Sequence, residues 1–318
     1  MAKLNRRHFM AAAGAAAAAL PMTGTGAFAQ EKIKIGFIFL GPIGDYGWTW
    51  AHNKGREALE AALGDKVETV YVENVAEDAS AIPVMRDLAQ QGCKLIFTTS
   101  YGYMDQTIQV ASEFPDVKFE HCTGFKLADN VSVYNSRFHE GRAVLGTIAG
   151  MMSKSGTMGY LGSYKVPEVV LGVNSFLLAA QKKNPAATLK LVFIDSWFDP
   201  PKEAAATETL LNLGADIVTT HTDSPAALQI LEQRGLFGFG QGADMSAFAP
   251  KAHLTAIEDI WGPYYILRAQ AMLDGTWTSA NTWDGMVDGT VVISPYNAAI
   301  PADVVAEADK IKAGYMDG

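Results

Sequence analysis

The chain has 318 residues, of which 49% are hydrophobic and 19% are charged. This composition excludes a disordered or fibrous protein, and the length predicts two lobes rather than one. The 25 Lys and Arg residues and the 34 Asp and Glu residues give a formal net charge of -9, which argues against a nucleic-acid-binding surface. The two cysteines, Cys93 and Cys122, exclude a disulfide scaffold and a multi-cysteine metal cluster, and we expect both to be buried thiols.

Residues 1–29 have the order of an export signal. Arg6-Arg7 precedes an alanine-rich apolar stretch, and Ala27-Phe28-Ala29 has the small-x-small pattern of a cleavage site. The arginine pair resembles a twin-arginine signal, and an ordinary secretory signal is the alternative. Pro21 ends the apolar stretch well short of the about 20 residues that a membrane span needs, so no membrane anchor is expected. The sequence therefore predicts cleavage after Ala29 and a periplasmic mature protein.

From residue 33 onward, apolar β-branched runs alternate with segments of helical spacing. The strands expected in the first half are Ile33–Leu40, Val67–Val72, Lys94–Thr99, Lys118–Thr123 and Val131–Tyr134. The helices expected between them are Thr49–Leu63, Ala79–Gln91 and Tyr103–Phe114. This βα order predicts an α/β lobe with a parallel sheet and helices on both faces.

The second half repeats the alternation. Its expected strands are Thr157–Leu161, Lys190–Ile194, Ile217–Thr220, Leu236–Gly240 and Leu254–Ile257. Its expected helices are Glu140–Met152, Val169–Lys183, Lys202–Leu213, Ala226–Arg234, Pro263–Leu273 and Ala302–Ala313. Two doubly wound lobes of this kind bind ligands beyond the carboxyl ends of their strands, so the cleft between the lobes is the expected site.

Several motifs then occur in an order that resembles a known family. They are Phe37–Gly55, Phe114–Phe119, Phe138-His139-Glu140-Gly141-Arg142, Asn184-Pro185, Asp195–Pro200 and Leu213–Val218. In this order they resemble the basic membrane protein family, the substrate-binding proteins of ABC importers for purine nucleosides and related compounds. The resemblance covers residues 31–318 and implies a type I periplasmic-binding-protein fold: two doubly wound parallel-sheet lobes joined by three hinge crossings.

The resemblance also implies a division of the chain and a set of partners. The crossings would lie near Tyr134–Phe138, Glu258–Gly262 and Trp283–Val291. The first lobe would comprise residues 30–136 and 260–283, and the second would comprise residues 137–259 and 284–318. The implied partners are a small-molecule ligand and an ABC transporter permease. We expect a monomer without cofactor, metal or nucleic acid.

The loop after the first predicted strand carries Asp45, Tyr46 and Trp48 at the expected cleft edge. Aromatic faces stack on planar heterocycles with roughly 1–3 kcal/mol per base. An aspartate accepts hydrogen bonds from an exocyclic amine or a ring N–H, as carboxylates do from cytosine. Trp50 lies inside the predicted helix, so we expect it to anchor that helix in the core.

Further candidates follow other strands of the two predicted sheets. Trp197 follows a strand of the second lobe, where the family usually places a stacking aromatic, so the resemblance implies that Trp48 and Trp197 sandwich a planar ring. Other residues lie at strand carboxyl ends, namely Tyr101, Tyr103, Asp105 and Asp223. For the two acids, a helix N-cap is an equally open interpretation.

The chain departs from the family pattern at two places that concern the ligand. Nucleoside binders commonly carry Ile-Gly-Val-Asp-x-Asp-Gln, and Gly242 stands here in place of the first Asp. They also carry Thr-Ser-x-x-Lys, and Asp259 stands in place of the Lys, with Trp261 close behind. The lost Asp and Lys are groups suited to ribose hydroxyls. We therefore expect the ligand to be a purine nucleobase, with adenine as the first candidate, or another flat N-heterocycle. A purine nucleoside is the alternative ligand.

Other function classes are less well supported by the sequence. It contains no nucleophile elbow, phosphate-binding loop or zinc-binding helix motif, and its histidines lack metal-ligand spacing, so we expect a binding protein rather than an enzyme. A nucleoside hydrolase would need an Asp-rich calcium cluster near the first strand, where Asp45 stands alone. A periplasmic sensor that presents its closed form to a receptor would use the same scaffold, and the sequence leaves this alternative open.

Overall fold

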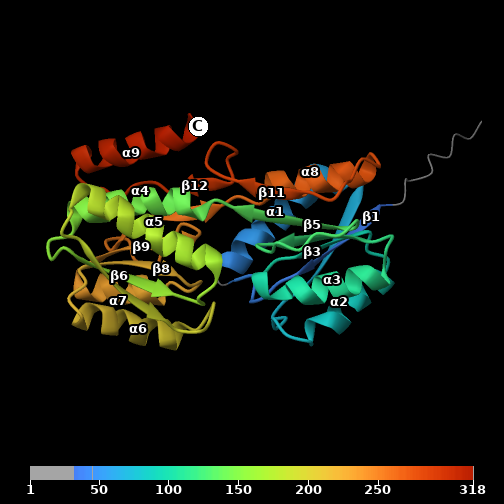
Figure 1. Ribbon diagram of the computed structural model, residues 1–318, viewed down its shortest axis with the longest axis horizontal. Helices are drawn as coiled ribbons and strands as arrows, with labels where there is room; N and C mark the ends of the chain where they lie inside the picture. Colours follow the sequence, from blue (N-terminus) through green and yellow to red (C-terminus); the bar gives the residue numbers. More distant parts are fainter. Residues whose placement is uncertain (1–31, 45, 318) are drawn as a thin grey trace, which may run out of the picture. The chain divides into compact units, whose positions relative to one another are not determined.

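A computed structural model describes residues 32–44 and 46–317, and the predicted export signal and Asp45 lie outside the described residues. Strands and helices alternate along this part of the chain and build two α/β lobes, each around its own sheet (Figure 1). This arrangement confirms the predicted fold class. No helix of the described residues is long and apolar enough to cross a membrane.

The first lobe contains a six-stranded parallel sheet. Its strands are β1 (Ile33–Ile38), β2 (Val67–Val72), β3 (Leu95–Thr98), β4 (Lys118–Cys122), β5 (Val131–Ser136) and β11 (Asn281–Asp284). They lie in the order β11-β5-β4-β3-β1-β2. One face is covered by α1 (Trp48–Leu63) and α8 (Gly262–Leu273), and the other by α2 (Ala81–Gln90) and α3 (Met104–Glu113), which follows the 3₁₀ turn η1 (Tyr101–Tyr103) (Figure 1).

The second lobe contains a six-stranded mixed sheet. Its strands are β6 (Thr157–Gly162), β7 (Thr188–Phe193), β8 (Ile217–His221), β9 (Phe237–Gly242), β10 (His253–Asp259) and β12 (Val291–Ile293). They lie in the order β12-β10-β9-β8-β6-β7. The helices on one side are α4 (Phe138–Met152), α5 (Pro167–Lys183) and α9 (Ala302–Met316), and those on the other are α6 (Pro200–Asn212) and α7 (Ala226–Arg234) (Figure 1).

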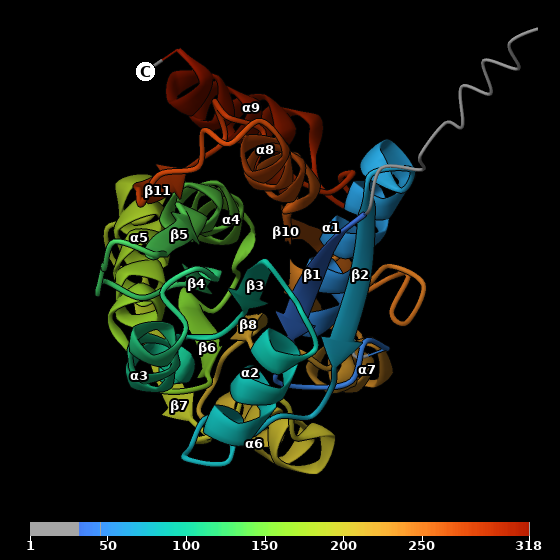
Figure 2. The same ribbon diagram turned by 90° about the vertical axis from the view of Figure 1, so that its right-hand side faces the viewer.

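Strand β1 shows why the apolar runs of this sequence form interior strands. Ile35 and Phe37 belong to the core beneath α1 and α8, where the rings of Phe37 and Phe97 stack with centroids 4.8 Å apart. Ile38 belongs to the core on the opposite face, beneath α2 and α3. Successive side chains of a strand point to opposite faces, so helices on both faces bury the run from Ile35 onward. Figure 2 shows β1 beside β2, with α1 along them.

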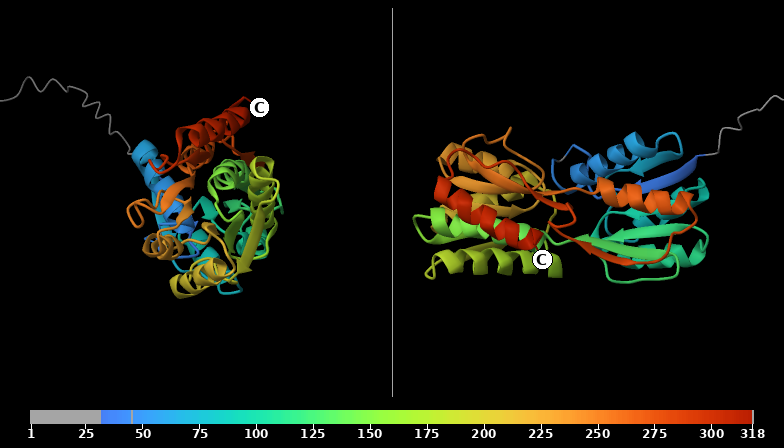
Figure 3. Two further views of the ribbon diagram at one scale, coloured as in Figure 1. Left: turned by 90° about the vertical axis from the view of Figure 1, so that its left-hand side faces the viewer. Right: turned by 90° about the horizontal axis from the view of Figure 1, so that it is seen from above.

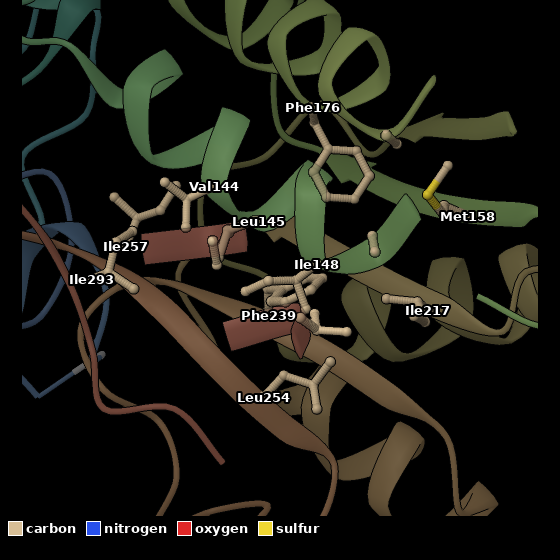
Figure 4. Close-up of a cluster of buried hydrophobic side chains, with 14 of the residues drawn as sticks. Val144, Leu145, Ile148, Met158, Phe176, Ile217, Phe239, Leu254, Ile257 and Ile293 are labelled. Carbon is tan, nitrogen blue, oxygen red and sulfur yellow. The ribbon is translucent and has the colours of Figure 1, made fainter. Parts of the chain in front are cut away.

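The second lobe buries its core between α4 and the sheet. Leu145 and Ile148 of α4 meet Phe239 of β9, and Phe176 of α5 closes the cluster from above (Figure 4). Full burial of each such side chain contributes roughly 1.5–3 kcal/mol relative to exposure. Gly146 and Gly150 let α4 approach α5 closely, because a Cβ on Gly146 would lie 2.2 Å from the carbonyl oxygen of Phe176.

The chain passes between the two sheets at three places: between β5 and α4, between β10 and α8, and between β11 and β12. Helix α8 consequently packs on α1 of the first lobe, and α9 packs on α4 of the second (Figure 3). Strands β11 and β12 were not expected from the sequence, because runs of three or four residues carry little periodicity. Strand β12 pairs antiparallel with β10, unlike the expected all-parallel sheet. Its first residue, Val291, pairs with Asp259 at the end of β10, so β12 enters its sheet at the hinge side, directly after β11 of the other lobe, and runs against β10.

Candidate ligand-binding site

A pocket lies where the carboxyl ends of strands from both lobes meet. The space between its walls is about 410 Å³, and this figure includes solvent at its open side. The first lobe contributes Trp48, Ser100 and Thr123. The second contributes Phe138, Glu168, Trp197, His221, Asp223, Gln241 and Gly242. A molecule in this pocket therefore touches both lobes.

Trp48 is the aromatic residue of the first-lobe wall, and its ring is held on several sides. Its Nε1–H donates to the carbonyl oxygen of Thr99, which follows β3. The ring packs edge-on against Phe138 and Trp261, with centroids 5.8 and 5.5 Å away. Because the N–H and the edge contacts fix the indole, Trp48 offers a stacking surface that loses little rotamer freedom on binding.

Trp197 is the aromatic residue of the second-lobe wall. Its Nε1–H donates to Oε2 of Glu77, a first-lobe residue, over 2.9 Å. Glu77 also accepts hydrogen bonds from the Ser100 hydroxyl and the Gly102 N–H. The backbone carbonyl of Trp197 accepts from the N–H of Asp223 at 3.0 Å. The Trp197 loop is therefore tied to both lobes.

The lobes approach each other closely around Gly47, Asp223 and Gly242. Oδ1 of Asp223 accepts the backbone N–H of Trp48 at 3.1 Å, across the lobe boundary. Gly242 has φ +83°, and a Cβ on it would lie 2.8 Å from the carbonyl carbon of Gly47. A side chain at either glycine would push the lobes apart. The close approach and the left-handed backbone both require glycine at position 242.

The pocket has a polar but largely uncharged wall. Burial and the nearby Arg142 lower the pKa of His221 well below its usual value, so the ring is neutral, and its Nδ1 lies 3.1 Å from the Tyr160 hydroxyl. Burial and the carboxylates of Glu77 and Asp259 raise the pKa of Glu168 to about 8, so this side chain is mostly a neutral acid at pH 7. Among the described residues that line the pocket there is no lysine or arginine.

A buried network connects the pocket wall to the hinge. Gln241 accepts a hydrogen bond from Arg142 at 2.5 Å and lies 3.4 Å from Asp259 through Nε2. Asp259, at the end of β10, accepts the hydroxyl of Ser136, at the end of β5, over 3.1 Å. Burial raises the pKa of Asp259 to about 7 and lowers that of Arg142. The network therefore joins two of the three crossings to a residue that faces the pocket.

Some of the site residues predicted from the sequence line the pocket. Four of them line it, namely Trp48, Trp197, Asp223 and Gly242. Tyr101 lines an adjoining hollow of about 670 Å³, which shares Thr123, Phe138 and Glu168 with the pocket. Asp45 lies outside the described residues.

The other predicted residues lie away from the pocket, each for a local reason. Tyr46 stacks on Trp50 and packs edge-on against Phe248. Tyr103 is buried in the first-lobe core, where its hydroxyl donates to the carbonyl oxygen of Val75. Asp105 is exposed and pairs with Lys126.

Of the three candidates at the departures from the family pattern, Asp259 and Trp261 lie behind the pocket wall, whereas Gly242 lines it. Asp259 belongs to the hinge network. Trp261 is buried beneath Trp48 and stacks on His52 at a centroid distance of 4.7 Å. Trp261 therefore supports a pocket residue from the core side, since it ends the turn into α8 and its ring points into the first lobe.

Sequence reasoning missed other lining residues, namely Ser100, Thr123, Phe138, Glu168, His221 and Gln241. Most of them lie at or just after the carboxyl ends of strands, where the sequence predicts the cleft edge. His221 lacks metal-ligand spacing and was therefore not predicted, although it is the last residue of β8 and lies two residues before Asp223. Glu168 gives a weaker signal, because an acid in the first turn of a helix usually reflects the helix dipole.

Comparison with known proteins agrees with this architecture. Residues 32–313 match the model of the Bmp family, described as ABC transporter substrate-binding protein PnrA-like. A purine-binding protein of Brucella abortus (strain 2308) is 55% identical over 297 residues, covering 93% of this chain and 85% of that protein. A Haloferax volcanii protein named for an ABC transporter glucose-binding role is 32% identical over 281 residues, covering 88% of this chain and 71% of that protein.

Solved structures with low sequence identity to this chain share its fold. A solute-binding protein of an ABC transporter system from Aeropyrum pernix K1 superposes with a TM-score of 0.78 at 16% identity, and the match covers 90% of this chain and 92% of that one. The family match and the 55% identical relative together confirm the resemblance and the expectation of a binding protein rather than an enzyme. The chain belongs to the Bmp family of PnrA-like substrate-binding proteins of ABC transporters.

Proposed function

We propose that this chain binds a purine nucleobase, with adenine as the expected ligand, and delivers it to an ABC importer. The observation that carries the proposal is that Trp48 and Trp197, from opposite lobes, line one pocket. Indole faces stack on any planar base. The purine-binding name of the 55% identical Brucella abortus relative supports the purine class.

The electrostatics of the pocket favour an uncharged ligand. The residues that line it include Glu168 and Asp223 but no described lysine or arginine, and a nucleotide phosphate would need cations or a cluster of N–H donors. His221 is neutral and has Nε2 left for a ligand, because Nδ1 faces Tyr160. Neutral polar groups that can donate or accept suit the edge of a base.

The choice of a base over a nucleoside rests on Gly242. This residue lines the pocket without a side chain, so the carboxylate that nucleoside binders commonly carry here is missing from the wall. The approach of Gly47 leaves no room for a replacement in the closed arrangement. One observation favours a nucleoside instead: the adjoining hollow of about 670 Å³ could accept a sugar attached to a base in the pocket.

A calorimetric panel decides between these ligands. Adenine, guanine, hypoxanthine, adenosine, guanosine and glucose are titrated into the mature protein, which is first unfolded and refolded to remove ligand carried from the host. Adenine is expected to bind at least tenfold more tightly than adenosine. Tighter binding of adenosine would reject the nucleobase proposal, and binding of glucose alone would reject the purine class.

We also propose that the chain acts as a monomer in the periplasm and reaches it through the twin-arginine route. The paired arginines of residues 1–29 support this route. An Arg6→Lys, Arg7→Lys double variant should remain in the cytoplasm, whereas a variant with Lys3→Arg should be exported normally. Export of the double variant at the normal rate would favour the ordinary secretory route.

A further inference from the structure

Glu168 differs from the other acids of the site because nothing in the described protein satisfies its carboxyl group. It lies in the first turn of α5 and forms part of the wall shared by the pocket and the adjoining hollow. No hydrogen bond or ion pair reaches it from the described residues. Glu77, by contrast, accepts bonds from Trp197, Ser100 and Gly102. A carboxyl group without partners in a pocket wall is a group left for the ligand.

The surroundings of Glu168 determine which form of the carboxyl group meets the ligand. The charged groups that act on its pKa are the carboxyl groups of Glu77 and Asp259, and both disfavour a negative charge at this position. The other titratable groups around the two hollows are His221, Asp223, Tyr101 and His139, with the Cys122 thiol behind the wall. None of the histidines supplies a cation, because burial lowers the pKa of both His221 and His139.

A neutral carboxylic acid has a hydrogen-bonding pattern that a carboxylate lacks. It presents one O–H donor beside one carbonyl acceptor, whereas a carboxylate only accepts. The N1 and N6 edge of adenine presents an acceptor beside an amino donor, which is the complementary pattern. Burial among protein atoms and the two neighbouring carboxylates raise the pKa of Glu168 to about 8, so the acid form predominates at neutral pH.

We propose that Glu168 selects the ligand by pairing, as a protonated acid, with a base edge that carries a donor beside an acceptor. This inference rests on the proposed binding of a purine base. Trp48 and Trp197 provide stacking, which every base accepts, so the choice among bases falls to a polar group that reads one edge. Binding of such an edge holds the proton on Glu168, and adenine affinity is therefore linked to proton uptake.

The test compares the wild type with Glu168→Gln and Glu168→Ala, with adenine as the titrant. Calorimetry at pH 7, 8 and 9, in two buffers with different protonation enthalpies, gives both the affinity and the number of protons taken up. The wild type should bind adenine about tenfold more weakly at pH 9 than at pH 7, because a pKa near 8 leaves about a tenth of the protein in the acid form at pH 9. Proton uptake should rise over the same interval.

The two variants separate pairing from charge. Glu168→Gln keeps a donor beside an acceptor, so its affinity for adenine at pH 7 should stay within a few-fold of the wild type. Because an amide does not titrate, the affinity of this variant should also stay constant between pH 7 and pH 9. Glu168→Ala should bind at least tenfold more weakly at pH 7, since the base edge loses its partner. Glu113→Gln, a surface change at the Arg86 ion pair, is the matched control and should behave as wild type.

The outcomes distinguish this inference from the function on which it rests. If the wild type binds none of the purine bases, the proposed function fails. If the wild type binds adenine with the same pH dependence and proton uptake as Glu168→Gln, the proposed function stands and the role of Glu168 is rejected. A Glu168→Ala variant that binds as tightly as the wild type, with an unchanged thermal midpoint, rejects that role as well.

Discussion

The indole Nε1–H of Trp197 donates a hydrogen bond of 2.9 Å to the carboxylate of Glu77, and this bond joins the two lobes at the rim of the pocket. It disappears when the lobes separate, so it stabilises the closed arrangement only. A hydrogen bond to a charged group contributes about 1.5–3 kcal/mol. The closed form that a permease recognises therefore depends on a contact that the ligand itself does not make.

Replacing Trp197 by Phe should weaken ligand binding about tenfold, because the ring still stacks but the bond to Glu77 is lost. Calorimetry with the best ligand of the panel measures the change. Trp277→Phe is the matched control, since the Nε1–H of Trp277 donates to Glu120 inside the first lobe, away from the pocket. That variant should lose stability without losing affinity. Equal affinity losses in both variants would contradict the role of the lobe-joining bond.

Replacing Trp48 by Ala should lower the affinity by about 1–3 kcal/mol, the worth of one stacked base. Trp50→Ala is the comparison, because Trp50 lies two residues further along α1 and does not line the pocket. Calorimetry and thermal unfolding are measured on both variants. If Trp50→Ala reduces the affinity as strongly as Trp48→Ala, stacking on Trp48 is not the source of the binding energy.

Replacing Gly242 by Ala should reduce both stability and affinity. The left-handed backbone at φ +83° costs an alanine roughly 1–2 kcal/mol, and its Cβ would also meet the carbonyl carbon of Gly47. Gly235→Ala carries the same kind of backbone cost at φ +66° with no atom near the new Cβ. Both variants should lose about 1 kcal/mol in the free energy of unfolding, but only Gly242→Ala should bind at least tenfold more weakly. Unchanged binding by Gly242→Ala would show that closure tolerates a side chain there.

The buried carboxyl of Asp259 should make stability depend on pH. Its pKa is raised to about 7 in the folded protein, against about 3.9 in an unfolded chain, so the folded state binds the extra proton between these values. Stability contributed by this group is complete below about pH 4 and is lost as the pH rises to about 7, at up to about 1.4 kcal/mol per pH unit. Asp259→Asn should flatten the decline in the thermal midpoint between pH 5 and pH 7. A decline as steep as that of the wild type would contradict this titration.

The cysteines should be unreactive in the native protein. Cys93 and Cys122 are free and buried, and burial raises the pKa of the Cys93 thiol to about 11 and that of Cys122 well above its usual value. A thiol reagent at pH 8 should label neither residue before unfolding and both afterwards, because the thiolate is the reactive form. Rapid labelling of the native protein would show that one of them is exposed by opening of a lobe.

The sequence predicted the strands that carry a long apolar run and the place where they end. Ile33–Leu40 corresponds to β1, and its carboxyl end leads to Trp48 in the observed pocket. Helix starts were less accurate. Helix α5 begins at Pro167, two residues before the expected start, because a proline at the first helical position lacks an N–H that the helix does not need.

The inward or outward direction of single aromatic side chains could not be predicted. Trp48 and Trp261 both flank helix starts, yet one faces the pocket and the other the core, because α1 and α8 pack against each other on the same face of the sheet. The sequence also did not predict Glu168 and His221 as pocket residues, since their place in the pocket depends on neighbours that are distant in the chain. Gly242, by contrast, was predicted from the sequence, because it replaces the Asp of the family pattern. The close approach of Gly47 explains why no side chain stands there.

The late position of β11 and β12 in the chain has a consequence for biosynthesis. Strand β11 pairs with β5, and β12 pairs with β10, so β5 and β10 remain edge strands until the segment after α8 has been made. An exposed edge strand invites pairing with another chain, and such non-local pairing is formed late. A nascent or truncated chain that ends before this segment would expose β5 and β10 together. The segment after α8 therefore completes both sheets, and we expect the longest continuous stretch of either lobe, expressed alone, to aggregate more readily than the whole chain.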